Sequence, residues 1–440
     1  MAEIQAFRAV HYSGSCSQDL DRIITPPYDV ISAEEQEAFY RSHPHNIIRL
    51  VLGKQYPDDS SSNNRYTRAA TALSQWLEEG VLVRDERPAF TVYQMEFDQP
   101  DGGRDSIDGI VALVKVDDYG KGKVLPHEKT YKGPKQDQLN LLRACMGTFT
   151  PIHALFSDEH DVVVREYGRF MKQPPEQEAR DANGSIHRTW TVSDEDAIAK
   201  IRGVLQEESL FIADGHHRYE TALAFRNEQR ASGLAQAEGP HEYVMMFLTS
   251  MSHPGLMILP AHRMVKGLAG LDLGQMETIL EPYFSMEALT FSSESRDEVS
   301  NTLIQRIRSY SNVGGKFGMV VRGEDCFRLL RLKDFKAVDS LMDADIPSTL
   351  RGLDVTILRE IILGHALGLD KDNAEGHIEY TPLVSEALNK VLKGEIQVSF
   401  ILNPTRVDQM RAAAELGHKL PQKSTYFYPK ISSGLVLNVF

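Results

Sequence analysis

A run of polar residues at Asp214–Arg218 has the composition of an anion-binding site. It lies in the stretch LFIADGHHRYE, where a short apolar run is followed by Asp214-Gly215, two histidines and an arginine. We expect a strand, a tight turn and a helix that starts near His216. The first N–H groups of a helix attract anions, and imidazole and guanidinium groups are donors suited to phosphate oxygens. The alternative is that Asp214 only caps the helix, and that His216 and His217 lie on a solvated turn.

A second group, Pro126-His127-Glu128, places a carboxylate near basic side chains, because Lys129, Lys132 and Lys135 follow closely. A carboxylate among ammonium groups stays ionised and can accept a proton or hold a metal. The stretch lacks the second histidine of a zinc-binding HExxH helix, so we do not expect a metalloprotease. The alternative is a solvated loop whose charges balance.

A third group, Lys423-Ser424-Thr425, places one ammonium and two hydroxyl groups on consecutive residues. These groups suit phosphate oxygens, and the aromatic run Tyr426–Tyr428 would anchor the segment or stack on a base. The glycines of a Walker A loop are missing, and no GxGxxG follows a strand, so neither a P-loop nor a Rossmann site is expected. The alternative is a structural strand rich in aromatic residues.

The elements that must position these groups mix helix and strand. Ser32 with Glu35 predicts a capped helix after the rigid stretch IITPPYDVI, and NIIRLVL at Asn46–Leu52 predicts a strand. Phe90–Phe97 and Ile107–Val116 predict a hairpin. The fold class is therefore mixed α/β.

A glycine-rich stretch, KGLAGLDLG at Lys266–Gly274, indicates a domain boundary. We expect a first domain over residues 1–268, which carries the PHE and DGHHR groups. A second α/β domain over residues 269–440 would contribute the QKST segment as a phosphate-binding element.

The composition excludes several classes of protein. The 440 residues carry a formal charge of −14, which argues against a nucleic-acid partner because phosphate backbones need a basic face. The three cysteines are widely spaced and give no disulfide framework or zinc spacing. No apolar run reaches the roughly 18 residues of a membrane span, and the N-terminus does not resemble a signal peptide. We expect a cytoplasmic protein with no membrane partner.

The three groups occur in an order that resembles a known family. Pro126-His127-Glu128, Asp214–Arg218 and Lys423-Ser424-Thr425 are similar to the motifs of the ADP-dependent free serine kinases of the ParB/sulfiredoxin superfamily. Over nearly its whole length, with PPYDVI, ADGHHRYE, HIEY and PQKSTYFYPK, the chain resembles a bacterial and archaeal family, domain of unknown function 1015. The kinase resemblance covers the motifs alone, and the first two motifs are farther apart here.

The resemblance implies a ParB/sulfiredoxin-like first domain and a role for each motif residue. Glu128 would take the proton of a serine hydroxyl, with Asp214 and His216 as the other catalytic residues. His127, His217 and Arg218 would hold the transferring phosphate or its metal, and the lysine and hydroxyls of the third group would bind phosphate. Sulfiredoxin activity is excluded because a histidine stands at position 216 where that chemistry needs a cysteine.

The sequence therefore predicts phosphoryl transfer on a small hydroxy amino acid in serine metabolism, as a free serine kinase or an O-phosphoserine phosphatase. The companions expected are Mg²⁺ and ADP or ATP. One alternative is a non-catalytic, nucleotide-binding ParB-like regulatory module. Another is a metal-dependent hydrolase with His127, His216 and His217 as ligands. The oligomeric state stays open.

Overall fold

The computed structural model describes residues 2–100, 102–128, 132–233, 238–308, 314–370, 373–374, 376–421 and 423–440, without the side chains of residues 132–134. The chain forms two compact units. Unit 1 comprises residues 1–257 and 429–440, and unit 2 comprises residues 258–428. The chain therefore leaves unit 1 once and returns to it for its last residues.

The strands of unit 1 are β1 (Ile4–Gln5), β2 (Val10–Tyr12), β3 (Leu82–Arg84), β4 (Phe90–Asp98), β5 (Arg104–Lys115), β6 (Val124–Leu125), β7 (Gly147–Thr148), β8 (Ile152–Phe156), β9 (Gln177–Arg180), β10 (Ile186–Val192), β11 (Leu210–Asp214), β12 (Tyr243–Ser250) and β21 (Asn438–Val439). Its helices are α1 (Leu20–Ile23), α2 (Ala33–Ser42), α3 (Ile48–Val51), α4 (Arg65–Glu78), α5 (Lys132–Cys145), α6 (Val162–Gly168), α7 (Glu195–Leu205) and α8 (His216–Ser232), with short 3-10 turns that include Tyr28–Val30.

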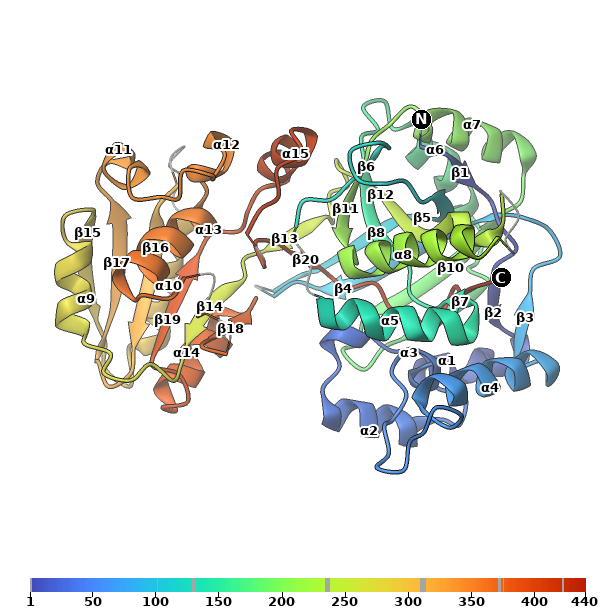
Figure 1. The fold of residues 1–440 in the computed structure, drawn as a ribbon, viewed down its shortest axis with the longest axis horizontal. Helices are drawn as coiled ribbons and strands as arrows, with labels where there is room; N and C mark the ends of the chain where they lie inside the picture. Colours follow the sequence, from blue (N-terminus) through green and yellow to red (C-terminus); the bar gives the residue numbers. More distant parts are fainter. Residues whose placement is uncertain are drawn as a thin grey trace. The chain divides into compact units, whose positions relative to one another are not determined.

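Most strands of unit 1 form one mixed sheet in the order β6-β11-β8-β12-β5-β4-β10-β9, with β1 paired to β5. All eight residues of β12 are buried, since β12 lies between β8 and β5 in this sheet. Helix α8 crosses one face of the sheet, and α5 lies beside α8 (Figure 1). Tyr219 and Ala222 of α8 join the buried core that the strands form. The sheet thus fixes the position of α8, and α8 begins in the DGHHR sequence.

Unit 2 has its own sheet, in the order β15-β17-β16-β19-β14-β18. Its strands are β13 (Met257–Leu259), which begins at the boundary, β14 (His262–Val265), β15 (Phe284–Thr290), β16 (Lys316–Val321), β17 (Cys326–Leu332), β18 (Ile378–Thr381), β19 (Val398–Leu402) and β20 (Tyr426–Tyr428). Its helices are α9 (Leu273–Leu280), α10 (Arg296–Arg308), α11 (Phe335–Asp339), α12 (Ser348–Arg351), α13 (Asp354–Ile357), α14 (Val384–Leu392) and α15 (Val407–Glu415), and a π-helix spans Leu358–Ala366. Apolar side chains of α10 and α14 pack on this sheet as a separate core.

The mixed α/β class expected from the sequence is confirmed, and the capped helix α2 and the hairpin of β4 and β5 form as expected. The expected strand at Asn46–Leu52 is wrong, because this segment forms the short helix α3. Ile48, Leu50 and Val51 of α3 are all buried. A short apolar run suits a buried strand or a buried helix equally, and packing decides between them.

The boundary between the units differs from the one expected at residues 268/269. The chain enters unit 2 after Met257, and β14 already pairs with β18 and β19 of that unit before the glycine-rich stretch begins. The last twelve residues belong to unit 1, where Asn438 and Val439 pair with β7. The glycine-rich stretch is thus a turn inside unit 2. The boundary between the units follows from which strands pair with each other.

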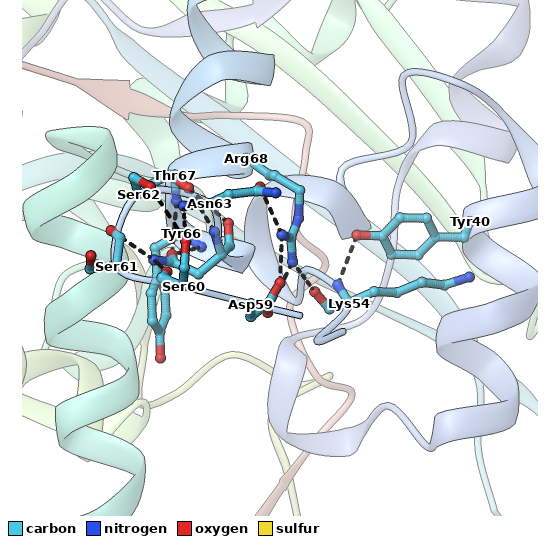
Figure 2. Close-up of polar contacts among 11 residues, drawn as sticks. Tyr40, Lys54, Asp59, Ser60, Ser61, Ser62, Asn63, Tyr66, Thr67 and Arg68 are labelled. Atoms are coloured by element: carbon cyan, nitrogen blue, oxygen red, sulfur yellow. Dashed lines mark hydrogen bonds and ion pairs between the residues drawn. The ribbon is translucent and has the colours of Figure 1, made fainter. Parts of the chain in front are cut away.

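The polar stretch after α3 forms a closed loop. Arg68 donates two hydrogen bonds to Asp59, at 2.7 and 3.1 Å, and a third to the Lys54 carbonyl at 2.8 Å (Figure 2). Asn64 caps α4 by accepting from the N–H groups of Tyr66 and Thr67. Within the described part of the chain, no helix has the length and apolar content to cross a membrane.

Candidate functional site

Strand β11 ends in a bulge that sets the direction of Asp214. Ile212 pairs with Ala154 of β8, and Asp214 pairs with the next residue of β8, His153, so Ala213 is the extra residue. A bulge of this kind turns the side chains that follow it, and bulges are common beside active sites. Asp214 and His153 are therefore cross-strand partners at the end of the strand.

Gly215 permits the tight turn from β11 into α8. Its φ of +94° lies in the region that only glycine adopts without strain, and it is the N-cap residue of α8. A Cβ atom at this position would lie 2.9 Å from Nε of Arg218, because the arginine side chain folds back over the glycine. Among the described residues, no side-chain hydrogen bond caps the start of α8. The alternative in which Asp214 is the cap is therefore wrong.

The carboxylate of Asp214 instead holds two cations. Nη2 of Arg218 donates to Oδ2 at 2.7 Å, and the ammonium group of Lys430 bonds to Oδ1. Nη1 of Arg218 donates to the Pro151 carbonyl at 2.5 Å. The side chains of Asp214, Arg218 and Lys430 are between 11% and 17% exposed. We call these three residues the DRK cluster; together they carry a net charge of +1 at the uncapped start of α8.

The cations of the DRK cluster keep Asp214 ionised. Burial alone would raise the pKa of the carboxyl, but Lys430 and Arg218 outweigh it and hold the pKa well below its usual range. A permanently ionised carboxylate with both oxygens bonded to cations does not transfer protons near neutral pH. Asp214 therefore fits the role of a positioning residue, and the catalytic role that the sequence suggested stays a prediction.

Histidines buried beside the cluster are neutral. Burial lowers the pKa of His127 to about 4 and that of His153 to about 3. The rings of His127 and His216 meet edge to face with centroids 4.6 Å apart, and Nε2 of His216 accepts from the backbone N–H of His127 at 3.4 Å. His217 is half-buried. His127 and His153 therefore add no positive charge near neutral pH, whereas Arg218 and Lys430 each add one.

Of the three lysines expected near Glu128, the structure describes the side chain of Lys135. Glu128 is half-buried next to His127. Lys135 forms an ion pair with Glu220 at 2.6 Å, so this ammonium already has a carboxylate partner. Lys129 and the side chain of Lys132 lie outside the described residues. The role of Glu128 as a proton acceptor stays a prediction.

The third group, Lys423-Ser424-Thr425, lies in unit 2. Ser424 is 1% exposed, its hydroxyl donates to the Pro421 carbonyl at 2.5 Å, and its own carbonyl accepts from the Thr405 hydroxyl. The hydroxyl hydrogen of Ser424 is thus used within the segment, which fits a structural role. Lys423 is exposed with a φ of +56°, and Thr425 is half-buried, so their phosphate-binding role stays a prediction. Gln422 lies outside the described residues.

Lys430 is the site residue that sequence reasoning missed. It follows the aromatic run by two positions, and 216 residues separate it from Asp214. Lys430 is the second lysine of PQKSTYFYPK, a stretch that the sequence analysis already connects with phosphate binding. The expected boundary placed this lysine in the second domain, away from the DGHHR sequence. Only the return of the chain to unit 1 brings the two together.

The described residues include no group of three or more His, Cys, Asp or Glu side chains that could hold a metal ion. Mg²⁺ prefers carboxylate oxygens, but both oxygens of Asp214 are bonded to cations. His216 uses Nε2 as an acceptor for a backbone N–H group. The described groups do not fit a resident metal, and the alternative of a hydrolase with His127, His216 and His217 as ligands has no support from them.

Comparisons with known proteins give a family and several distant structural similarities. No curated protein matches the chain. The structure is similar to free serine kinase in complex with AMP, at 14% identity and a TM-score of 0.36 over 74% of this chain and 92% of that chain. It is also similar to a conserved hypothetical protein from Pyrococcus furiosus, at 12% identity and a TM-score of 0.35 over 75% of this chain and 94% of that chain.

A third similar structure is SbnI with a C-terminal truncation from Staphylococcus aureus, at 12% identity and a TM-score of 0.36 over 75% of this chain and 87% of that chain. Similarities of this size carry no argument about activity. The family model described as protein of unknown function (DUF1015) matches residues 4–356. The chain therefore belongs to the DUF1015 family.

Proposed function

We propose that the protein transfers a phosphoryl group between a nucleotide and a small hydroxy amino acid, with serine as acceptor or O-phosphoserine as donor. The observation that carries the proposal is the DRK cluster, in which Asp214 fixes the cations of Arg218 and Lys430 at the start of α8. Phosphoryl transfer depends mainly on positioning and charge neutralisation, and a fixed guanidinium and ammonium supply both.

In the proposed step, the serine hydroxyl oxygen forms a bond to the terminal phosphorus of ADP or ATP as the P–O bond to the rest of the nucleotide breaks, and AMP or ADP leaves. The hydroxyl proton passes to the carboxylate of Glu128, a role that rests on the resemblance of Pro126-His127-Glu128 to the kinase motif. Arg218 and Lys430 neutralise charge on the transferring group. Neutral His127 and His153 line the site without adding charge.

Phosphorus NMR tests the proposal directly. The full chain is incubated with L-serine, MgCl₂ and either ADP or ATP, and separately with O-phosphoserine and AMP or ADP. We expect a resonance of O-phosphoserine to grow in the first mixture or to decline in the second. If folded protein gives no turnover in any combination, the proposal is wrong.

A Glu128→Gln variant separates this function from the alternative of a nucleotide-binding regulatory module. An enzyme that uses Glu128 as base loses its rate but keeps its affinity for nucleotide. A regulatory module keeps its affinity and has no rate to lose. Nucleotide affinity is measured by isothermal titration calorimetry on the same preparations.

A further inference from the structure

A groove between α5 and α8 has no part in the step proposed above. The two helices lie side by side, and the groove along them has a volume of about 640 Å³ (Figure 1). It is lined by residues of α5, by residues of α8 and by Tyr119 from the connection between β5 and β6. Ligand pockets in proteins measure roughly 300–1,000 Å³, so this groove has room for a molecule as large as a nucleoside.

The α8 side of the groove is one face of the helix that begins in the DGHHR sequence. Four of its lining residues recur every three or four positions along α8, namely Glu220, Leu223, Ala224 and Asn227. His216 and His217 precede Glu220 by four and three positions, so they begin the same face. From His216 to Asn227 the helix rises about 16 Å. The groove therefore extends along α8 towards its start, where Arg218 folds back over Gly215.

Much of the lining is apolar and suits a flat ring. Leu139 of α5 and Leu223 and Ala224 of α8 contribute aliphatic side chains, and Tyr119 contributes an aromatic ring. The Tyr119 ring is stacked on the buried Tyr219 ring, with centroids 5.4 Å apart and 20° between the planes. The core thus fixes Tyr119, and a nucleobase is the kind of flat, aromatic group that such a surface accommodates.

Two exposed amides in the lining offer a donor and an acceptor. Arg226 donates to Oδ1 of Asn227 from Nε at 3.2 Å and from Nη2 at 2.9 Å, which leaves the Asn227 NH₂ group as a donor. Nε2 of Gln136 donates to Asn140 at 3.0 Å, which leaves Oε1 of Gln136 as an acceptor. Adenine presents a donor, its N6 amine, beside an acceptor, N7, whereas guanine presents two acceptors at that edge. The pair of amides therefore matches adenine.

The charges of the lining fit a ribose with phosphates beyond it. Lys135 and Glu220 form an ion pair at 2.6 Å, so together they add no net charge. Among the described residues that line the groove, Glu220 is the only acidic one. A carboxylate in such a place accepts hydrogen bonds from ribose hydroxyls. Phosphates that follow the ribose towards the start of α8 come to the DRK cluster, whose net charge is +1.

We infer that this groove binds the adenosine part of a nucleotide, with the base at Asn227 and Gln136 and the phosphates directed to the start of α8. The inference deepens the proposed function and rests on it, because it takes this nucleotide to be the partner of the phosphoryl transfer. It gives Asn227 and Gln136 a role in selecting the base, which the reaction itself does not need.

Binding is tested by isothermal titration calorimetry on the full chain without serine. The probes are AMP, GMP, ribose 5-phosphate and adenosine. GMP changes the base, ribose 5-phosphate lacks it, and adenosine lacks the phosphate. Because a stacked base and a matched base edge each contribute strongly to affinity, we expect AMP to bind about tenfold or more tightly than each of the others. If AMP does not bind, or if any of the other three binds as tightly, the inference is wrong.

Two variants with the same change of charge separate a contact with the base from a general electrostatic effect. Asn227→Asp keeps an oxygen for Arg226 but replaces the donor with an acceptor, so we expect an unchanged Tm and about fivefold weaker AMP binding, the effect of one hydrogen bond. Asn140→Asp keeps the oxygen that Gln136 and Arg143 bond, and Asn140 does not line the groove, so AMP affinity should stay within about twofold. Equal losses in the two variants, or no loss in Asn227→Asp, would overturn the inference.

Failure of the inference and failure of the proposed function give different results. AMP binding that Asn227→Asp weakens, without phosphoryl transfer to any acceptor, supports the groove and rejects the kinase proposal. Phosphoryl transfer to serine with a KM for nucleotide unchanged by Asn227→Asp supports the kinase proposal and rejects the groove as its nucleotide site.

Discussion

Two aspartate–arginine pairs in unit 1 have different partners. Arg68 donates a hydrogen bond to each carboxylate oxygen of Asp59, and its guanidinium also bonds to the Lys54 carbonyl and to Asn63 (Figure 2). Asp214 receives one bond from Arg218 and gives its other oxygen to Lys430. The Arg68 and Asp59 side chains are 33% and 20% exposed, against 11% and 17% for Arg218 and Asp214.

The difference teaches which pair is available for a ligand. The Asp59–Arg68 pair sums to zero charge, and every bond that it makes closes the loop before α4. The DRK cluster carries a net charge of +1 and is less exposed, and charges interact more strongly there than at the surface, so the proposed phosphoryl group would balance its charge. An aspartate–arginine ion pair alone therefore does not indicate an anion site. The proposal depends on the second cation, Lys430.

The largest expected effect comes from removing the guanidinium of the DRK cluster. We expect Arg218→Met to lower kcat/KM for phosphoryl transfer by about 10³, or about 4 kcal/mol, as for the loss of a main electrostatic contact. The matched variant, Arg68→Met, removes the guanidinium of the neutral pair and should leave the rate unchanged. Rates come from phosphorus NMR, and equal losses in the two variants would remove the distinction between the pairs.

Acid should weaken the fold near the DRK cluster more than at the Asp59 loop. His127 and His153 have folded pKa values of about 4 and 3, below the ordinary 6.5, so the unfolded chain binds their protons first as the pH falls. The stability that the fold gains from these neutral imidazoles is fully present above pH 6.5. As the pH falls toward 4, the free energy of unfolding decreases by up to about 3 kcal/mol for each imidazole. Denaturant unfolding at pH 7.5, 6, 5 and 4.5 measures it.

A His153→Asn variant should lose less stability than the unaltered chain over this acid range. His11 provides a control of opposite sign, because its hydrogen bond to Asp85 raises its pKa. The stability that His11 contributes is present below pH 6.5 and is lost as the pH rises through its folded pKa. A His11→Gln variant should therefore keep the loss of stability in acid.

Removing the second cation should convert the DRK cluster into a neutral pair like the one at Asp59. We expect Lys430→Met to lower kcat/KM by between tenfold and a hundredfold, up to about 3 kcal/mol. Lys430→Arg keeps the charge and should recover most of the rate. A Lys430→Met variant with full activity would show that the second cation has no part in the reaction.

The smallest effect should come from the turn that places Arg218. Gly215→Ala puts a Cβ at a positive φ and 2.9–3.0 Å from the guanidinium, so we expect a loss of about 2 kcal/mol in unfolding free energy and a lower rate. Gly184→Ala is the control, because Gly184 also has a positive φ but no atom within 4 Å of the added Cβ. It should show the backbone strain alone, measured by thermal unfolding, with an unchanged rate.

Patterns of neighbouring residues in the sequence predicted much of the fold, including the turn between β11 and α8 at the candidate site. The capping box at Ser32 and Glu35, the hairpin of β4 and β5, and the strand, turn and helix around Gly215 each depend on neighbouring residues, and each forms. The helix α3 was missed because burial on all sides removes the periodicity that separates helix from strand.

The position of Lys430 and the bulge in β11 depend on contacts between residues far apart in the sequence, which no pattern of neighbouring residues predicts. Lys430 meets Asp214 across 216 residues, and the bulge at Ala213 depends on the register with β8. The sequence motif suggested an anion site made by Asp214–Arg218, with a capping aspartate as the alternative. Burial made His127 and His153 neutral, and long-range pairing made Asp214 the holder of two cations.

The return of the last twelve residues to unit 1 has a consequence for biosynthesis. A ribosome makes Lys430 after all of unit 2, so a nascent chain that already carries β11 and α8 still has an incomplete cluster at Asp214. Residues 429–440 must be made and must dock beside β7 before the second ammonium group arrives. A chain that stops just before Lys430 therefore keeps most residues of both units but lacks the ammonium group that bonds Oδ1 of Asp214.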